Sequence, residues 1–310
     1  MYHTQRRRGG GLLLGVLISL VLLVLVALPL AVGLILTHPP RHAPAVTPRS
    51  VGLAYVAVGF PSRTDHVPIS GWWIPASGSG GRTAILAPGY GQNRLIGDIG
   101  LPLAVELHGL GWNVLMFDFR ASGLSGGSIC SIGQYEVRDL LGAADFARQR
   151  VGTGGPLVVL GYSMGATVAL MAAERDPAIS GVLADSPFAS LVPYLQQSMR
   201  QWTHLPNVPF NWIILRVVPL ITGLQPQRVD PLADMAALGT RPVLLIAGTA
   251  DRLVPDSNAR QLAAAGGPGT SLWLVEGAGH IGAWQTAPQA YREHMRAWLT
   301  QVAAAPGGAS

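Results

Sequence analysis

The chain has 310 residues, of which 49% are hydrophobic and 12% charged, so it carries ample material for a large core and a composition that excludes intrinsic disorder. Its formal net charge of +5 comes from arginine alone, because the sequence contains no lysine. Arg6, Arg7 and Arg8 are clustered, whereas the other arginines are scattered, which argues against a nucleic-acid-binding surface. The single cysteine, Cys130, cannot form an internal disulfide, and no Cys/His group has zinc-ligand spacing.

A long apolar segment follows the three clustered arginines. No charged residue occurs from Gly9 to Leu36, and residues 12–36 are almost entirely Leu, Val, Ile, Ala and Gly. As a helix rising about 1.5 Å per residue, this segment exceeds the roughly 30 Å thickness of a bilayer's hydrocarbon core. We therefore expect a transmembrane anchor over residues 11–36. Because basic residues favour the cytoplasmic side, residues 1–10 are predicted to be cytoplasmic and the domain after the anchor extracytoplasmic.

A cleaved signal peptide is the alternative interpretation of this segment. Signal peptides have a shorter apolar region of about 7 to 15 residues and end in small residues at an A-x-A-like site. Here the run ends in residues 34–37, without such a site, and Pro39 and Pro40 follow. The sequence thus favours an uncleaved anchor in the cell membrane, with secretion after cleavage left open. Residues 37–50 are rich in proline and predict a stiff linker.

Strand-length apolar runs alternate with helix-like stretches through residues 51–303, as is typical of βαβ units and a mostly parallel sheet. We predict eight strands, the first two antiparallel, at residues 53–60, 67–74, 83–87, 112–117, 157–160, 179–184, 243–247 and 271–275. Helices are predicted at residues 101–110, 134–150, 164–175, 256–265 and 288–302. These elements predict one doubly wound α/β domain over residues 51–303, followed by a flexible tail at 304–310.

Residues 187–228 interrupt this alternation, because they separate two predicted strands by far more than a simple crossover requires. The segment is rich in Pro, Trp, Leu and Ile, and we predict that it is a helical cap inserted into the domain. Its apolar side chains indicate an apolar acyl group in the substrate, or simply pack the cap; they are Trp202, Phe210, Trp212, Ile213, Ile214 and Leu215.

The pentapeptide at residues 161–165, Gly-Tyr-Ser-Met-Gly, matches G-x-S-x-G directly after a predicted strand and directly before a predicted helix. That is the context in which this motif forms a nucleophile elbow, and its glycines are expected because the turn leaves little space for side chains. Ser163 is therefore the candidate nucleophile. The alternative is a glycine-rich turn whose serine caps the helix.

A serine hydroxyl needs an adjacent base, and the base needs an orienting carboxylate. Asp251 follows the predicted strand 243–247 and His280 follows the predicted strand 271–275, so both lie at carboxyl ends of strands. The order Ser, Asp, His is the one found in α/β hydrolases. Asp251 could instead cap a helix, and His280 could be an ordinary loop histidine. Asp185, at the end of another predicted strand, is the alternative acid.

Two backbone N–H groups are needed to stabilise the developing oxyanion. Met164, the residue after the nucleophile, supplies the first. Tyr90, in the loop after the predicted strand 83–87, is the best candidate for the second, and Gly91 is the alternative.

Together these motifs resemble the α/β-hydrolase superfamily, and within it the membrane-anchored Bem46-like and serine-aminopeptidase-like hydrolases. The resemblance covers residues 51–303 and rests on the loops at 88–91 and 118–125, the elbow around Ser163, and the loops of Asp251 and His280. The sequence departs from the family at Pro88, where a histidine is usual. It departs again at residues 120–123, Arg-Ala-Ser-Gly, where Arg-Gly-His-Gly is usual.

The residues and the resemblance together imply a serine hydrolase that cleaves carboxylic esters through an acyl-enzyme. The expected substrate is a small-molecule or lipid-like acyl compound, and no cofactor or metal is required. The same three side chains also serve peptidases, thioesterases and acyltransferases, and a non-catalytic, membrane-tethered binding module is an alternative of another class.

Overall fold

The computed structural model describes residues 9–78, 81–152 and 154–305. The chain divides into two compact units. The helical unit comprises the N-terminal segment up to Thr37 together with Leu195–Leu224, and the sheet unit comprises His38–Tyr194 and the chain from Gln225 onwards. Most of the predicted cytoplasmic segment and most of the predicted flexible tail, residues 1–8 and 306–310, lie outside the described residues.

The sheet unit is built on an eight-stranded sheet with the order β1-β2-β4-β3-β5-β6-β7-β8. The strands are β1 (Val56–Pro61), β2 (Pro68–Ile74), β3 (Thr83–Ala87), β4 (Asn113–Phe117), β5 (Leu157–Tyr162), β6 (Ile179–Asp185), β7 (Val243–Gly248) and β8 (Thr270–Val275). Strand β2 is antiparallel to both of its neighbours, and the other pairs are parallel. The prediction of a mostly parallel, eight-stranded sheet is therefore confirmed.

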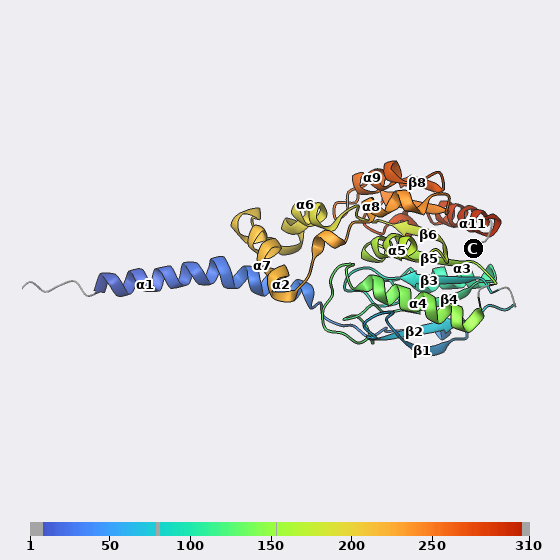
Figure 1. Ribbon diagram of the computed structural model, residues 1–310, viewed down its shortest axis with the longest axis horizontal. Coiled ribbons are helices and arrows are strands. Elements are labelled where there is room, and N and C mark those ends of the chain that lie inside the picture. Colours follow the sequence, from blue (N-terminus) through green and yellow to red (C-terminus); the bar gives the residue numbers. More distant parts are fainter. Residues whose placement is uncertain (1–8, 79–80, 153, 306–310) are drawn as a thin grey trace, which may run out of the picture. The chain divides into compact units, whose positions relative to one another are not determined.

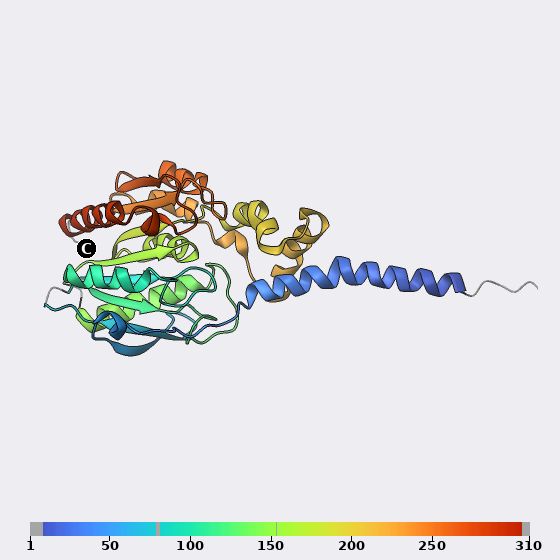
Figure 2. The ribbon, with the colours of Figure 1, turned by 180° about the vertical axis from the view of Figure 1, so that it is seen from behind.

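The central strands are apolar because helices cover both faces of the sheet. Every residue of β3, β4, β5 and β7 is buried, as expected for strands that contact solvent on neither face. Helices α4 (Glu136–Val151) and α5 (Met164–Arg175) cover one face (Figure 1). Helices α3 (Gly100–Gly109) and α11 (Pro288–Ala304) cover the other (Figure 2), where Leu103, Leu107, Met295, Trp298 and Leu299 join one apolar cluster with the strands.

The remaining elements of the sheet unit are short helices. They are η2 (Pro48–Val51), η4 (Pro226–Arg228), α8 (Pro231–Asp234), η5 (Met235–Leu238), α9 (Ser257–Ala265) and α10 (Ala283–Thr286). Residues of the predicted linker are tied to this unit, since Arg41 donates a hydrogen bond to the Ser125 carbonyl at 2.8 Å and Asn93 donates one to the His42 carbonyl at 3.0 Å. The linker is thus partly a packed segment rather than a bare spacer.

Some predicted element boundaries are wrong by one to three residues, for identifiable reasons. The first strand begins at Val56 instead of residue 53, because η2 and Gly52, with φ 78°, turn the chain before it. Helix α4 begins at Glu136 instead of residue 134. The Glu136 carboxylate accepts hydrogen bonds from the backbone N–H groups of Ser131 and Gly133 and so holds the preceding turn.

The helical unit contains a long apolar helix made of α1 (Gly9–Leu22), a π-helical turn η1 (Leu23–Ala27) and α2 (Leu28–Thr37). Within it, Gly11–Thr37 has a mean hydropathy of 3.1 over its most apolar window and is a candidate membrane span. The π-turn ends two residues before Pro29, which cannot donate a backbone hydrogen bond. The inserted segment is helical as predicted, with α6 (Leu191–Thr203), η3 (Asn207–Asn211) and α7 (Trp212–Thr222).

Candidate active site

Ser163 lies on the turn between β5 and α5, with backbone angles φ 53° and ψ −116°. The residues two positions before and after it must be glycines, because a Cβ on Gly161 would lie 2.3 Å from the Gly165 carbonyl oxygen and one on Gly165 would lie 2.2 Å from the Ala87 carbonyl oxygen. The Ser163 side chain makes no capping hydrogen bond to α5, so the helix-cap interpretation of this serine is not supported. Instead the strained turn projects the hydroxyl away from the helix.

The structure brings Ser163, His280 and Asp251 together, although 117 residues separate the first pair and 29 the second. His280 Nε2 lies 2.9 Å from Ser163 Oγ, and His280 Nδ1 lies 2.7 Å from Asp251 Oδ2. The imidazole side chain is 20% exposed and the Asp251 carboxylate is fully buried. Solvent therefore reaches the serine and the histidine, whereas the carboxylate stays out of water.

Both oxygens of the Asp251 carboxylate have hydrogen-bond partners. Oδ2 faces His280, and Oδ1 accepts hydrogen bonds from the backbone N–H groups of Leu253 and Val254, both at 2.9 Å. These bonds fix the carboxylate's orientation and leave Oδ2 as the acceptor for the imidazole. With Nδ1–H donating to Asp251, Nε2 is the ring nitrogen that can accept the serine proton.

The loops that carry Asp251 and His280 are joined to each other. Strands β7 and β8 are paired up to Gly248 and Val275, so the two loops leave the sheet side by side. Beyond the strands, the Ala250 N–H donates to the Ala278 carbonyl at 3.0 Å, and a Cβ on Gly248 would lie 2.1 Å from that same oxygen. This close approach of the two loops holds Asp251 and His280 at hydrogen-bond distance.

Asp185, the alternative acid, does not make the hydrogen bond to the imidazole. Its carboxylate accepts a hydrogen bond from Ser186 Oγ at 3.0 Å, and its backbone carbonyl accepts one from the Ser163 N–H at 2.8 Å. Burial raises the pKa of the Asp185 carboxyl to about 7. Asp185 is thus a buried group whose backbone carbonyl supports the backbone of Ser163.

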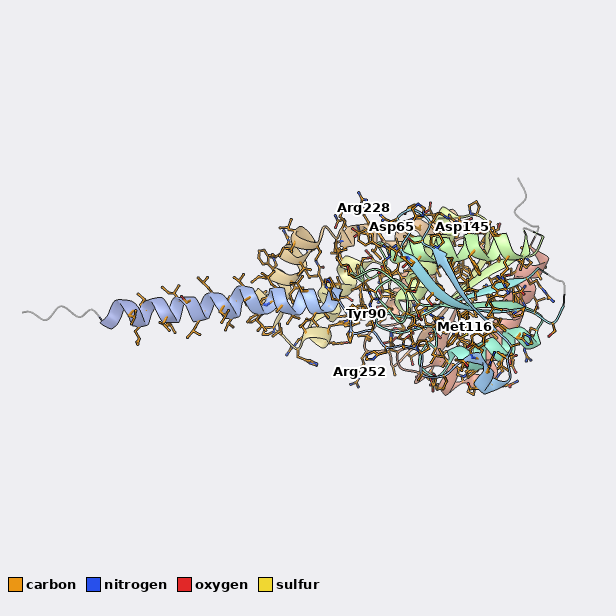
Figure 3. All side chains as sticks on the ribbon, turned by 90° about the horizontal axis from the view of Figure 1, so that it is seen from below. Asp65, Tyr90, Met116, Asp145, Arg228 and Arg252 are labelled. Atoms are coloured by element: carbon orange, nitrogen blue, oxygen red, sulfur yellow. The ribbon has the colours of Figure 1, made fainter. Side chains whose placement is uncertain are left out.

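The two predicted oxyanion donors come from segments that meet at Ser163. Met164 is the first residue of α5, where a backbone N–H has no partner within the helix. The loop after β3 runs past the serine, since a Cβ on Gly89 would lie 3.5 Å from Ser163 Cβ. The Gly89 N–H itself donates to Gln92 Oε1 at 3.1 Å. Tyr90 and Gly91, the two candidates from the sequence, follow it in this loop. In Figure 3, Tyr90 lies at the same end of the sheet unit as Arg252, while Met116 lies within the sheet.

Supporting residues near this site were not found by sequence reasoning. Arg94 and Asp118 form a fully buried ion pair at 2.5 Å, and the loop at 118–125 wraps around that carboxylate, with the Leu124 N–H donating to it at 2.8 Å. Ser186, between Asp185 and the loop of His280, was missed as well. The loop motif at residues 118–125 pointed to Asp118, but nothing in the sequence marks Arg94 as the partner of Asp118.

A separate hollow of about 1140 Å³ lies at the opposite end of the strands. It is lined by residues that precede or begin strands, among them Gly81, Thr83, Pro156, Arg241 and Thr270. None of the predicted site residues lines it. The described residues that line it include five glycines and four prolines and contain no histidine, aspartate or glutamate that could act as a base.

Comparison with known proteins agrees with the observed fold. The sequence model of the alpha/beta hydrolase family matches residues 84–294. The uncharacterized protein YqkD of Bacillus subtilis is 30% identical over 195 residues, which are 62% of this chain and 64% of YqkD. The uncharacterized protein Rv2307c of Mycobacterium tuberculosis is 29% identical over 246 residues, 77% of each chain.

Solved structures show the same fold. An esterase of Pyrococcus furiosus superposes with a TM-score of 0.72 at 28% identity, covering 86% of this chain and 98% of the esterase. The alpha/beta hydrolase GrgF of a Penicillium species superposes with a TM-score of 0.64 at 17% identity, covering 81% of this chain and all of GrgF, and at that identity the likeness concerns the fold alone.

Proposed function

Because the chain belongs to the alpha/beta hydrolase family, we propose that it is a serine hydrolase that cleaves carboxylic esters through an acyl-enzyme. The observation that carries this proposal is the continuous chain of hydrogen bonds from Ser163 Oγ through His280 to Asp251, at 2.9 and 2.7 Å. A nucleophile, a base and an orienting carboxylate in this arrangement are the elements of acyl transfer.

In the proposed reaction, His280 Nε2 takes the hydroxyl proton of Ser163 while Oγ attacks the acyl carbon. The carbonyl oxygen becomes an oxyanion, which the N–H groups of Met164 and Tyr90 stabilise. His280 then gives the proton to the leaving alcohol as the C–O bond breaks. A water molecule, deprotonated by His280, then attacks the acyl carbon; the bond from that carbon to Ser163 Oγ breaks, His280 returns the proton to Oγ, and the acid is released. Asp251 stabilises the imidazolium in both halves of the reaction.

Esters are the proposed substrate class for two reasons. Ester hydrolysis needs few groups beyond the three side chains and the two oxyanion donors, and the similar protein of Pyrococcus furiosus is described as an esterase. Peptidase, thioesterase and acyltransferase activities would use the same three side chains. The natural acyl group is proposed to be small or lipid-like. A binding module without catalysis would have no use for a serine held at hydrogen-bond distance from a histidine.

We also propose that the apolar helix anchors the chain in the cell membrane by a single span, with the sheet unit extracytoplasmic. Support comes from the length of Gly11–Thr37, 27 residues, and from a most apolar window of which none is buried. A helix of that length, at about 1.5 Å per residue, crosses a hydrocarbon core of roughly 30 Å. Secretion after cleavage of this segment is the alternative.

The test is hydrolysis of p-nitrophenyl esters of increasing acyl length by the full chain in detergent. Ser163→Ala is compared with Ser257→Ala, a matched change at an exposed serine. We expect turnover in the parent and in Ser257→Ala, and its loss in Ser163→Ala. Reaction with a fluorophosphonate probe that depends on Ser163, without ester turnover, would instead favour a peptidase or acyltransferase. No reaction with either would leave a binding module as the better explanation.

A further inference from the structure

The end of the apolar N-terminal helix packs against residues of the insertion almost two hundred positions later in the chain. Met199, Ile214 and Val218 form the centre of an apolar cluster in the helical unit, and the residues packed around it are Val32, Leu36, Leu195 and Leu215. In Figure 1, α7 accordingly lies alongside α2. This segment of the insertion, Leu195–Leu224, is hereafter called the hairpin.

The contact between α2 and α7 is close enough to require glycine. A Cβ on Gly33 would lie 2.2 Å from Val218 Cγ2 and 3.3 Å from Ile214 Cγ2. Small residues that let two helices approach in this way are typical of helix pairs within membranes. If the N-terminal helix were removed as a signal peptide, this face of α7 would lose its partner.

The other side of the hairpin exposes large apolar side chains. Val208 is 78% exposed, Leu220 83%, Ile221 58% and Trp212 56%. Water-soluble surfaces rarely gather such residues unless they bind something apolar. The neighbouring surface of the same unit is the apolar helix itself, whose side chains from Leu12 to Leu28 are also exposed. One apolar surface therefore continues from the candidate span onto the hairpin.

Several polar groups in the turn of the hairpin are paired with one another. Asn211, which is buried, donates hydrogen bonds to the Leu205 carbonyl at 3.3 Å and to Asn207 Oδ1 at 3.0 Å, and its own Oδ1 accepts one from Thr203 Oγ1 at 3.0 Å. Thr203 Oγ1 also accepts a hydrogen bond from the Leu205 N–H at 3.1 Å. A turn in contact with lipid must pair its polar groups internally, because no water is present to do so.

The hairpin's charges fit the surface of a bilayer. Residues 195–224 contain Arg200 and Arg216 and no acidic residue. The Arg216 guanidinium lies over the Trp212 ring, 5.6 Å from its centroid, and both Trp and the long arginine side chain favour the boundary between acyl chains and headgroups. Two arginines without a neighbouring carboxylate in the segment match anionic lipid headgroups.

The hairpin is too short to be a second span. Helices α6 and α7 have 13 and 11 residues and bend by 119° at the break between them. At 1.5 Å per residue they are roughly 20 and 17 Å long, less than the hydrocarbon core of about 30 Å. A bent pair of this size can enter one leaflet and return.

We propose that Leu195–Leu224 is a membrane-embedded hairpin that packs on a retained N-terminal helix and contacts the acyl chains of one leaflet of an anionic phospholipid bilayer. The proposal rests on the membrane anchoring proposed above. It assigns the exposed side chains of α7 and of the turn to lipid, and it makes the N-terminal helix part of the folded protein instead of a removable leader.

Lipid contact is tested on the full chain in vesicles of phosphatidylethanolamine and phosphatidylglycerol. Val208→Cys and Leu220→Cys are each labelled with bimane, and quenching by lipids with a nitroxide on the acyl chain is measured. Ile18→Cys in the span is the positive control, and Gln261→Cys, exposed on α9, is the negative control. Native Cys130 is buried, and burial raises the pKa of its thiol, so it should label slowly. We expect loss of fluorescence at 208 and 220 as at 18. Quenching no greater than at 261 would overturn the proposal.

Packing on the N-terminal helix is tested by a disulfide. A Cβ on Gly33 would lie 3.4 Å from Val218 Cβ, close to the separation of about 3.5–4.5 Å in disulfides. Gly33→Cys with Val218→Cys should cross-link in membranes, as judged by mass spectrometry of the non-reduced digest. Gly15→Cys with Val218→Cys is the control, since nothing lies within 4 Å of a Cβ at Gly15. Equal cross-linking of both pairs, or a mature chain that lacks residue 33, contradicts the proposal.

These measurements do not depend on catalysis, so the two proposals can fail separately. Ester turnover without quenching at 208 and 220 would leave the serine hydrolase intact and remove the embedded hairpin. Quenching and cross-linking in a protein without turnover would do the reverse. Release of the full chain from membranes by alkaline carbonate would remove the anchor and the hairpin together.

Discussion

The hydroxyl of Ser186 accepts a hydrogen bond from the backbone N–H of Ile281 at 3.1 Å, and both residues have left-handed backbone, with φ 57° and 54°. Positive φ is unfavourable for a serine and more so for a β-branched isoleucine. Ile281 directly follows His280, so this bond ties the histidine loop to the end of β6. Ser186 also donates to Asp185, which connects the histidine loop to a buried carboxyl.

Ser186→Ala should therefore lower kcat with little change in KM. Loss of the bond to Ile281 frees a strained backbone next to the proposed base, His280, and a small displacement of a catalytic group costs on the order of 10- to 100-fold in rate. Ester kinetics and the rate of fluorophosphonate labelling measure the effect. Ser186→Gly serves as a second variant, because glycine suits the positive φ but also lacks the hydroxyl. Restored activity in the glycine variant would mean that strain, and not the hydrogen bond, matters.

Asp185 should make stability fall as the pH rises from about 4 to about 7. Burial raises the pKa of this carboxyl from 3.8 to about 7, so within that window the folded state holds a proton that the unfolded state has released. Above about pH 7 the contribution is constant. Asp185→Asn removes this dependence, so the free energy of unfolding of the variant relative to the parent should rise between pH 4 and 7, by an amount on the order of 4 kcal/mol at most. Thermal unfolding of both proteins across this pH range measures it, and a difference that stays constant would contradict the assignment.

Asp65 should act in the opposite direction. Hydrogen bonds from Arg120 hold the pKa of the Asp65 carboxyl well below its usual range, so its stabilising effect is present above about pH 4 and is lost as the pH falls through the folded-state pKa. Asp65→Asn should cost about 2 kcal/mol at pH 7 and much less at pH 2. Asp256→Asn, which breaks an exposed pair with Arg260, is the matched control and should change little. Equal losses in both variants at pH 7 would contradict this reasoning.

Much of the fold follows from local patterns in the sequence. The central strands are continuous apolar runs because helices cover both of their faces, and residues 83–87 and 164–175 were predicted with the bounds that the structure has. The glycines at 161 and 165 also indicated the tight turn at Ser163, which the close approach of backbone atoms now explains. These features depend on residues near one another in the sequence.

The rest depends on contacts between distant residues. Asp185 ends β6 and Asp251 lies in the loop after β7. Only the three-dimensional path of the His280 loop makes Asp251 the hydrogen-bond partner of the imidazole, and its catalytic role stays a prediction. The pairing of Arg94 with Asp118 links residues 24 positions apart without any repeat or motif. Packing of Gly33 against Val218 is of the same kind. A sequence window cannot reveal such pairs, because each partner alone looks like an ordinary loop or helix residue.

The elbow should tolerate no side chain at Gly165. A Cβ there would lie 2.2 Å from the Ala87 carbonyl oxygen and 2.4 Å from that of Pro88, and both are backbone atoms that cannot move without displacing β3 and the loop of Tyr90. Overpacking of this kind costs about 1–3 kcal/mol and shifts neighbouring backbone. Gly165→Ala should thus reduce both thermal stability and ester turnover. Gly109→Ala, where nothing lies within 4 Å of the added Cβ, is the control and should match the parent in both measurements. If Gly165→Ala behaves like Gly109→Ala, the loop after β3 does not approach the start of α5 as closely as described, and the proposed pairing of Tyr90 and Met164 as oxyanion donors fails with it.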